Sequence, residues 1–129
     1  MQLTATSTTS TLVSTLPTPH LHFYHQGRQS KPLCELVSLQ SEDNYTWLIW
    51  ANGKRLLMPR TLKYYEAQLP ADGFIRLHRN CAVNISHIIA VRQLTRLGIE
   101  VTLSNGIRLA VARRRWVQIR DRLYQLGIS

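Results

Sequence analysis

Three consecutive arginines, Arg113-Arg114-Arg115, follow a strand-like alternating segment and open a stretch with helical spacing. Cations at a helix N-terminus oppose the helix macrodipole, at a cost of about 0.3–1 kcal/mol each when exposed. A sequence that breaks a local rule in this way often marks a functional site, because an external polyanion can supply the countercharge. Arginine pairs bidentately with phosphates and with guanine edges. The alternative is a frayed, solvated helix start.

A second polar cluster, His78-Arg79-Asn80, stands at the end of the alternating segment 74–78, where the chain is expected to turn. Arginine suits phosphate or guanine, and asparagine pairs with adenine or caps a turn. The sequence leaves His78 open between a ligand contact and a structural histidine. Asn84 precedes Ile85-Ser86-His87, and we expect it to cap a helical turn rather than to contact a ligand.

A third polar segment, 41–46, leads into an aromatic and β-branched run that is typical of a strand. Its neighbouring carboxylates, Glu42 and Asp43, have no second acid or histidine at catalytic spacing, so we interpret them as loop acids. Asn44 and Tyr45 lie at the expected tip of a hairpin, and a polar hairpin tip can enter a groove of a nucleic acid.

No pattern in the chain predicts a metal centre or a catalytic group. His20, His22 and His25 form an H-x-H-x-x-H pattern, but a strand places the third histidine on the opposite face from the first two. The chain contains no G-x-S-x-G, no H-E-x-x-H and no phosphate-binding loop. We therefore expect no metal site, no cofactor and no enzymatic activity.

Charge is distributed unevenly along the 129 residues, which carry 16 Lys+Arg against 7 Asp+Glu, a formal net charge of +9. Residues 1–20 carry no Lys, Arg, Asp or Glu, and residues 21–75 are nearly neutral. Residues 76–129 hold ten arginines against Glu100 and Asp121. A basic excess of this size favours a polyanionic partner, namely DNA, RNA or an acidic membrane surface. A solvated basic surface is the alternative.

Composition narrows the class of protein further. The length suits one domain plus a tail. No apolar run reaches the roughly 18–20 residues of a membrane span, and the N-terminus lacks the pattern of a secretory signal. Cys34 and Cys81 are far apart with no C-x-x-C spacing, which fits buried thiols in a reducing cytoplasm. We expect a disordered Ser/Thr-rich tail at 1–20 and a folded domain at 21–129.

The elements that must position the polar clusters are short strands joined by hairpin-length turns. Asn52-Gly53 and Asn105-Gly106 are strong two-residue hairpin signals, and Leu97-Gly98 is a weaker one. Strands are expected at 21–25, 33–40, 45–51, 54–58, 74–78, 88–93, 99–103 and 107–111. Helices are expected at about 62–69, capped by Thr61, and at 114–126. This pattern predicts a mainly β fold of small antiparallel sheets with two short helices.

These pieces, in this order, resemble the LytTR-type DNA-binding domain of bacterial response regulators over about 21–126. The most specific stretch is Phe74-Ile75-Arg76-Leu77-His78-Arg79-Asn80, followed by Val83-Asn84 and Ile88. The other pieces are Glu42-Asp43-Asn44-Tyr45, Arg60-Thr61-Leu62, and Val111-Ala112-Arg113-Arg114 after Asn105-Gly106.

The resemblance implies a LytTR-like domain that reads DNA through loops rather than through a recognition helix. Its loops are expected to enter successive major grooves of the DNA. Two copies of the domain are expected to bind a direct repeat and to bend the DNA. It implies base or groove contacts from three positions, namely Tyr45 with Asn44 beside it, Arg79 and Arg113, and we also expect His78 and Asn80 among the DNA-binding residues. It implies phosphate contacts from Arg60, Lys63, Arg114 and Arg115.

The chain departs from the family pattern at three positions. These departures affect which base sequence is expected to be recognised, and they do not affect the expected fold. Asn80 stands in place of the usual Ser, Cys81 in place of an aromatic residue, and Ala112 in place of the usual Ser. The larger departure is that residues 1–20 stand where the family commonly has a receiver domain. They contain no acid, so we expect no phosphoacceptor aspartate there.

Together these features predict a stand-alone, sequence-specific transcriptional regulator in the cytoplasm, at the nucleoid. Its expected partner is double-stranded DNA, bound as a homodimer, with an upstream sensor protein as a further possible partner and no membrane contact. Two alternatives stay open. One is a protein-interaction module that keeps the fold without specific DNA binding. The other is RNA binding, although most aromatic residues occupy core-like positions rather than the exposed positions needed to stack bases.

Overall fold

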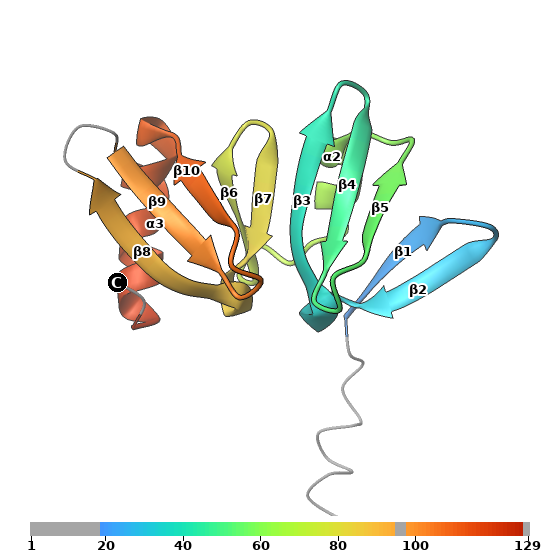
Figure 1. The fold of residues 1–129 in the computed structure, drawn as a ribbon, viewed down its shortest axis with the longest axis horizontal. Helices are drawn as coiled ribbons and strands as arrows, with labels where there is room; N and C mark the ends of the chain where they lie inside the picture. The colour runs from blue at the N-terminus through green and yellow to red at the C-terminus, as the bar shows by residue number, and fades with distance from the viewer. Residues whose placement is uncertain (1–18, 95–97, 128–129) are drawn as a thin grey trace, which may run out of the picture.

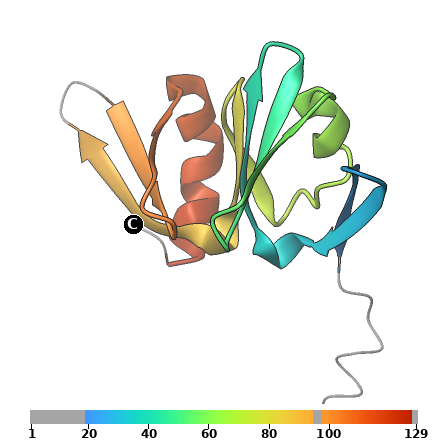
Figure 2. The ribbon, with the colours of Figure 1, turned by 45° about the vertical axis from the view of Figure 1, so that its right-hand side comes forward.

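The computed structural model describes residues 19–94 and 98–127, so the predicted tail, apart from Pro19 and His20, lies outside the described residues, as does Leu97 of the weaker predicted turn. In the described ranges, ten short strands form three antiparallel sheets, accompanied by the helices α2 and α3 and by two 3-10 turns. Figures 1 and 2 show the three sheets arranged along the longest axis of the molecule. The mainly β fold with two helices is confirmed.

The central sheet has five strands in the order β5-β4-β3-β7-β6. Two hairpins in it follow from local turn chemistry. Asp43, at φ 54°, helps turn the chain between β3 and β4, so that Glu42 lies opposite Tyr45. Gly53, at φ 90°, turns β4 into β5 as the Asn-Gly signal predicts. The strands are β3 (Leu36–Glu42), β4 (Tyr45–Trp50), β5 (Arg55–Met58), β6 (Phe74–His78) and β7 (Cys81–Asn84).

The two smaller sheets lie at either end of the central one (Figure 1). The predicted meander forms a three-stranded sheet in the order β10-β9-β8, and its strands are β8 (Ile88–Leu94), β9 (Gly98–Leu103) and β10 (Arg108–Val111). At the other end, β1 (His20–Tyr24) and β2 (Arg28–Pro32) form a hairpin. The helix α3 (Arg113–Gln125) follows β10 and packs against β6 and β9.

Two apolar cores lie on opposite faces of the central sheet, because side chains alternate along its strands. On β6, Phe74 belongs to the core shared with β1 and α2 (Leu62–Glu66), whereas Ile75 and Leu77 belong to the core shared with β8–β10 and α3. The polar loops at the strand ends are therefore carried by strands that are fixed from both sides.

Several boundaries differ from the predicted ones. The predicted strand 33–40 is two elements, because Leu33–Glu35 forms the 3-10 turn η1 and only Leu36–Glu42 is extended. The strand β2 was missed because its sequence, RQSKP, is polar throughout. The strand β7 was missed because all four of its residues are buried, which removes the alternation that marks a strand.

The two helices were placed correctly, but their ends differ from the predicted ends. The regular part of α2 ends at Glu66, earlier than the predicted residue 69, and β1 begins at His20 rather than at Leu21. Asn84 caps a helical turn as predicted. Its side-chain oxygen accepts from the Ser86 amide at 3.0 Å, and the 3-10 turn η2 (Ile85–His87) follows.

Candidate nucleic-acid interface

Four chain segments with polar or basic residues meet along one edge of the molecule. In Figure 1 the strands β3, β5, β6 and β10 all end at the upper edge. This places side by side the turn 43–44, the segment 59–61, the turn 79–80 and the start of α3. Hydrogen bonds between neighbouring segments hold this edge together.

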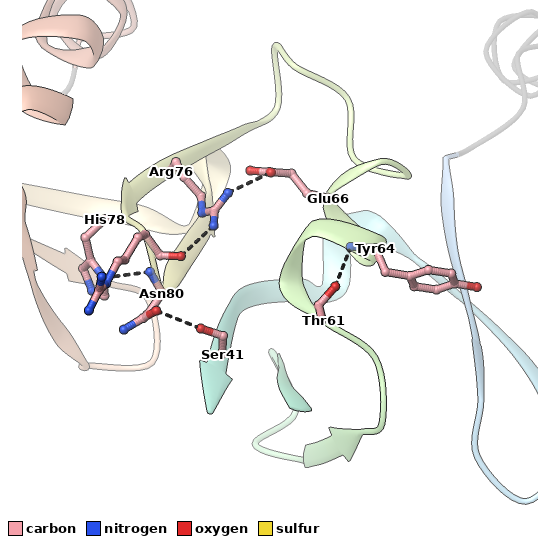
Figure 3. Close-up of polar contacts among 8 residues, drawn as sticks. Ser41, Thr61, Tyr64, Glu66, Arg76, His78 and Asn80 are labelled. Carbon is pink, nitrogen blue, oxygen red and sulfur yellow. Dashed lines mark hydrogen bonds and ion pairs between the residues drawn. The ribbon is translucent and has the colours of Figure 1, made fainter. Parts of the chain in front are cut away.

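The turn between β6 and β7 is tied to the end of β3 by two hydrogen bonds between Ser41 and Asn80. The Ser41 amide donates to the Asn80 carbonyl at 2.8 Å, and the Ser41 hydroxyl donates to Asn80 Oδ1 at 3.1 Å. The second of these is visible in Figure 3. The Asn80 amide group is thus held in place with its Nδ2 free to donate elsewhere. Sequence reasoning missed Ser41 as a positioning residue.

The start of α3 is tied to the same turn. The Ala112 amide donates to the Leu77 carbonyl at 2.9 Å, so the junction of β10 and α3 lies beside the end of β6. A cavity of about 560 Å³ lies between the two segments, and it is lined by His78, Arg79, Asn80 and 112–115. The two basic clusters that lie far apart in the sequence therefore form a single basic surface.

The segment that contains Arg60 is joined to the start of β4. The Thr46 hydroxyl donates to the Arg60 carbonyl at 2.7 Å, next to Tyr45 at the tip of its hairpin. The Arg60 guanidinium lies 4.6 Å from the centre of the Tyr64 ring, a cation–π contact. Thr61 caps α2 as predicted, since its hydroxyl accepts from the Tyr64 amide at 3.3 Å. Lys63 lies exposed in the first turn of α2.

Most of the candidate residues are open to solvent. Asn44, Arg79, Arg113 and Arg114 are exposed, and Tyr45 keeps 47% of its surface exposed. His78 and Arg115 are half-buried. The ion pairs in the described part of the chain are Arg76–Glu66 and Arg120–Asp121, so none of the candidate cations has a carboxylate partner there. We name this surface the loop edge, comprising Asn44, Tyr45, Arg60, Lys63, His78, Arg79, Asn80 and Arg113–Arg115.

Arg76 supports the loop edge from behind. Its guanidinium pairs with Glu66 of α2 at 2.8 Å and donates to the Arg79 carbonyl at 2.6 Å. These bonds appear in Figure 3. Arg76 therefore fixes the turn that carries Arg79 and, being paired, is not a free cation for a ligand. In the sequence, this role of Arg76 is indicated by its position as a charged residue in the middle of an apolar strand.

His78 lies half-buried in the loop edge. Burial lowers its pKa from the ordinary value of 6.5, and the nearby charges of Arg76 and Arg115 lower it further. The Asn80 amide donates to His78 Nδ1 at 3.2 Å, which assigns the proton of the neutral ring to Nε2. His78 can therefore offer an N–H donor from the wall of the cavity, and it also has a structural role.

Other functional classes find no support in the described structure. No group of three metal-ligating side chains occurs in the residues that are described. Among the helices of 19–94 and 98–127, none has the length and apolar character of a membrane-spanning segment.

The two cysteines are both free, but the prediction of buried thiols is wrong for Cys34, which is exposed, and right for Cys81. Cys34 is exposed because the 3-10 turn η1 directs it outward between two buried leucines.

The family model of the LytTr DNA-binding domain matches residues 30–124. The chain belongs to this family. A solved structure with a similar fold is the LytTr DNA-binding domain of a Bacillus cereus protein described as a methyl-accepting/DNA response regulator. It is 25% identical, with a TM-score of 0.70, and the match covers 83% of this chain and 98% of that one. A search of curated proteins found no match.

Membership in the LytTr family supports a DNA-binding regulator of transcription, with double-stranded DNA as its partner. The family is one of DNA-binding domains and not of enzymes. The matched residues include all of the loop edge.

Proposed function

We propose that this LytTr domain is a sequence-specific transcriptional regulator that reads successive major grooves through its loops and binds direct repeats as two copies. The observation that carries the proposal is the loop edge itself. The turns 43–44 and 79–80, the segment 59–61 and the start of α3 lie along this edge and expose cations that have no carboxylate partner within the described residues.

The side chains divide into two roles by their chemistry. Arg79, Asn80 and Arg113 carry donor groups that match guanine and adenine edges, and Asn44 and Tyr45 lie at a projecting tip. Arg60, Lys63, Arg114 and Arg115 supply charge, which binds phosphates independently of sequence and makes affinity depend on salt. His78 contributes one N–H donor beside Arg79.

The loop edge has a rigid scaffold, which is what base readout requires. The hydrogen bonds of Ser41 with Asn80, of Ala112 with Leu77 and of Thr46 with Arg60 link three of the segments to the sheets, and the fourth, the turn 43–44, joins β3 directly to β4. The side chains are thus presented from fixed backbone positions, so that less conformational freedom is lost on binding.

The proposed regulator is cytoplasmic, acts at the nucleoid and binds DNA as a homodimer. Its input would come from an upstream sensor protein. The alternative is a protein-interaction module that retains the fold without specific DNA binding.

The direct test is selection of bound sequences from a random duplex pool, with purified protein at modest salt. A direct repeat with half-sites about one helical turn apart, roughly 10–10.5 base pairs, would support the proposal. A pool without an enriched motif would favour the interaction-module alternative. Competition by single-stranded RNA that exceeds competition by duplex DNA would favour RNA binding.

A further inference from the structure

A groove of about 650 Å³ lies between the β1–β2 hairpin and α2, at the end of the molecule away from α3. Its polar wall includes His22, Tyr24 and Arg28 from the hairpin, and Arg60, Tyr64 and Gln68 from the region of α2. Three of these residues, His22, Tyr24 and Arg28, precede the stretch that matches the family model, which begins at residue 30. Nothing in the loop edge assigns them a role.

The hairpin is held firmly against α2, so the groove has a fixed shape. The His22 amide donates to Gln68 Oε1 at 2.9 Å, and Gln68 Nε2 donates to the His22 carbonyl at 3.1 Å. On the other face of β1, Leu21 and Phe23 are buried in the core with Trp50. The groove is therefore a preformed feature of the domain.

The groove carries positive charge and no negative charge. None of its lining residues is acidic, and the segment 19–32 contains no Asp or Glu at all. Arg28 is exposed, and neither Arg28 nor Arg60 forms an ion pair with any carboxylate of the described chain. Lys31, by contrast, lies 5.0 Å from the centre of the Trp50 ring and is engaged there.

Two exposed tyrosines stand beside these arginines. Tyr24 keeps 71% of its surface exposed and Tyr64 keeps 46%. Figure 3 shows the Tyr64 side chain extending from α2 towards the ribbon of the β1–β2 hairpin. Arginine guanidiniums and tyrosine hydroxyls are donors that contact the phosphate oxygens of DNA. Their combination in a groove without acids fits a phosphodiester chain.

The groove is continuous with the loop edge through Arg60. This residue lines the groove, contacts the Tyr64 ring, and is bonded through its carbonyl to Thr46 beside the Tyr45 tip. A duplex that lies along the loop edge and extends past Arg60 therefore reaches Arg28 next.

We propose that this groove binds the sugar–phosphate backbone of the same duplex, on the flank of the sequence that the loops read. Arg28 and Arg60 pair with phosphates, and Tyr24 and Tyr64 donate to phosphate oxygens from their hydroxyls. The proposal rests on the proposed function and extends its footprint by a sequence-independent contact to Tyr24 and Arg28, which precede the part of the chain that matches the family model.

The test compares the wild-type protein with Arg28→Gln and with Arg28→Gln combined with Tyr24→Phe, and measures affinity for duplex DNA across a salt series. Loss of one phosphate contact should lower affinity roughly three- to tenfold at 0.1 M salt. It should also reduce the slope of log affinity against log salt by about 1. Since phosphate contacts carry no sequence information, selected and scrambled duplexes should lose affinity alike.

The matched control is Arg108→Gln, which removes the same charge from an exposed arginine at the start of β10, away from the loop edge. This variant should leave the salt slope unchanged. Duplexes trimmed at one end or the other locate the contact, because trimming one of the two flanks should abolish the difference between Arg28→Gln and wild type. Circular dichroism melting verifies that each variant is folded.

A failure of the groove proposal can be distinguished from a failure of the proposed function. If the wild-type protein prefers its selected duplex but Arg28→Gln has the wild-type slope, the groove does not hold DNA and the present proposal is overturned, while the proposed function stands. The same result would leave a peptide or a second protein as the occupant of the groove. If the wild-type protein does not distinguish selected from scrambled duplexes, the proposed function fails, whatever Arg28→Gln does to the slope.

Discussion

The Ala112 amide donates a hydrogen bond to the Leu77 carbonyl at 2.9 Å. This bond joins the start of α3 to the end of β6, and it brings Arg113–Arg115 next to His78, Arg79 and Asn80 around one cavity. Burial lowers the pKa of His78, and the charges of Arg76 and of Arg115, which lies in the neighbouring segment, lower it further. Four arginines of the C-terminal half, Arg79 and Arg113–Arg115, thus share one surface.

The arginines at the start of α3 should differ in what they contribute to DNA binding. Arg113→Ala should cost about 1–3 kcal/mol on a selected duplex and relax discrimination, whereas Arg115→Ala should weaken all sequences alike. Electrophoretic shift titrations with selected and scrambled duplexes measure both effects, with Arg108→Ala as the control for loss of charge. Equal losses on both duplexes for Arg113→Ala would exclude a base-reading role.

Replacement of Arg76 should destabilise the fold and weaken specific DNA binding together. Arg76→Gln removes the ion pair with Glu66 and the bond to the Arg79 carbonyl, and we expect a loss of about 1–3 kcal/mol in the free energy of unfolding. Urea denaturation measures it. The other ion pair, Arg120–Asp121, is exposed and long, so Arg120→Gln should change stability by less than about 0.5 kcal/mol. Equal effects of the two changes would contradict the supporting role of Arg76.

The cap of α2 should be worth a measurable part of the stability. Thr61→Ala leaves the Tyr64 amide without its hydroxyl acceptor, and we expect a loss of about 1 kcal/mol in the free energy of unfolding. Thr61→Ser keeps an acceptor and should lose much less. Because α2 follows Arg60 directly and carries Lys63, Thr61→Ala should also weaken binding to selected and scrambled duplexes alike. Unchanged stability would show that the cap is not formed in solution.

His78 should titrate below the ordinary histidine value of 6.5, because burial and the charges of Arg76 and Arg115 lower its pKa. The unfolded chain then takes up the proton first on acidification. Stabilisation by His78 is therefore complete above pH 6.5 and is lost as the pH falls from there through the lowered pKa of the folded state. The difference in unfolding free energy between wild type and His78→Gln, followed from pH 7.5 to 5, measures this loss.

Nuclear magnetic resonance titration of the His78 ring checks the cause directly. Arg115→Gln should raise the midpoint towards 6.5, because it removes one of the two cations that lower the pKa. Arg108→Gln should leave the midpoint in place. A midpoint at or above 6.5 in the wild-type protein would contradict the placement of His78 in the loop edge.

The two thiols should differ sharply in reactivity. Burial raises the pKa of Cys81 to about 12, and thiolate is the reactive form, so Cys81 should be inert in the folded protein. Cys34 is exposed and should react with a disulfide reagent such as Ellman's reagent. We expect one reactive thiol per folded chain, close to none in Cys34→Ser, and both in denaturant. Rapid reaction of Cys81 under native conditions would mean that the core around β7 opens.

Local patterns in the sequence were sufficient for most of the secondary structure. The Asn52-Gly53 turn, the Thr61 cap and the Asn84 cap depend on contacts within a few residues, and the meander of β8–β10 pairs strands that follow one another in the chain. All of them are confirmed. The misses share a physical cause. Hydrophobic periodicity cannot mark a strand such as β2, which is polar on both faces, or β7, which is buried on both.

The sequence by itself determined the kinds of side chain available for binding, their position at strand ends, and the mainly β fold that carries them. Only the tertiary structure decided which of them share a surface. That depends on long-range hydrogen bonds such as Ser41 with Asn80 and Ala112 with Leu77, whose partners no local pattern reveals. It also decided that Arg76 is paired with Glu66 while Arg79 and Arg113 have no carboxylate partner within 19–94 and 98–127, because pairing is set by which elements pack together.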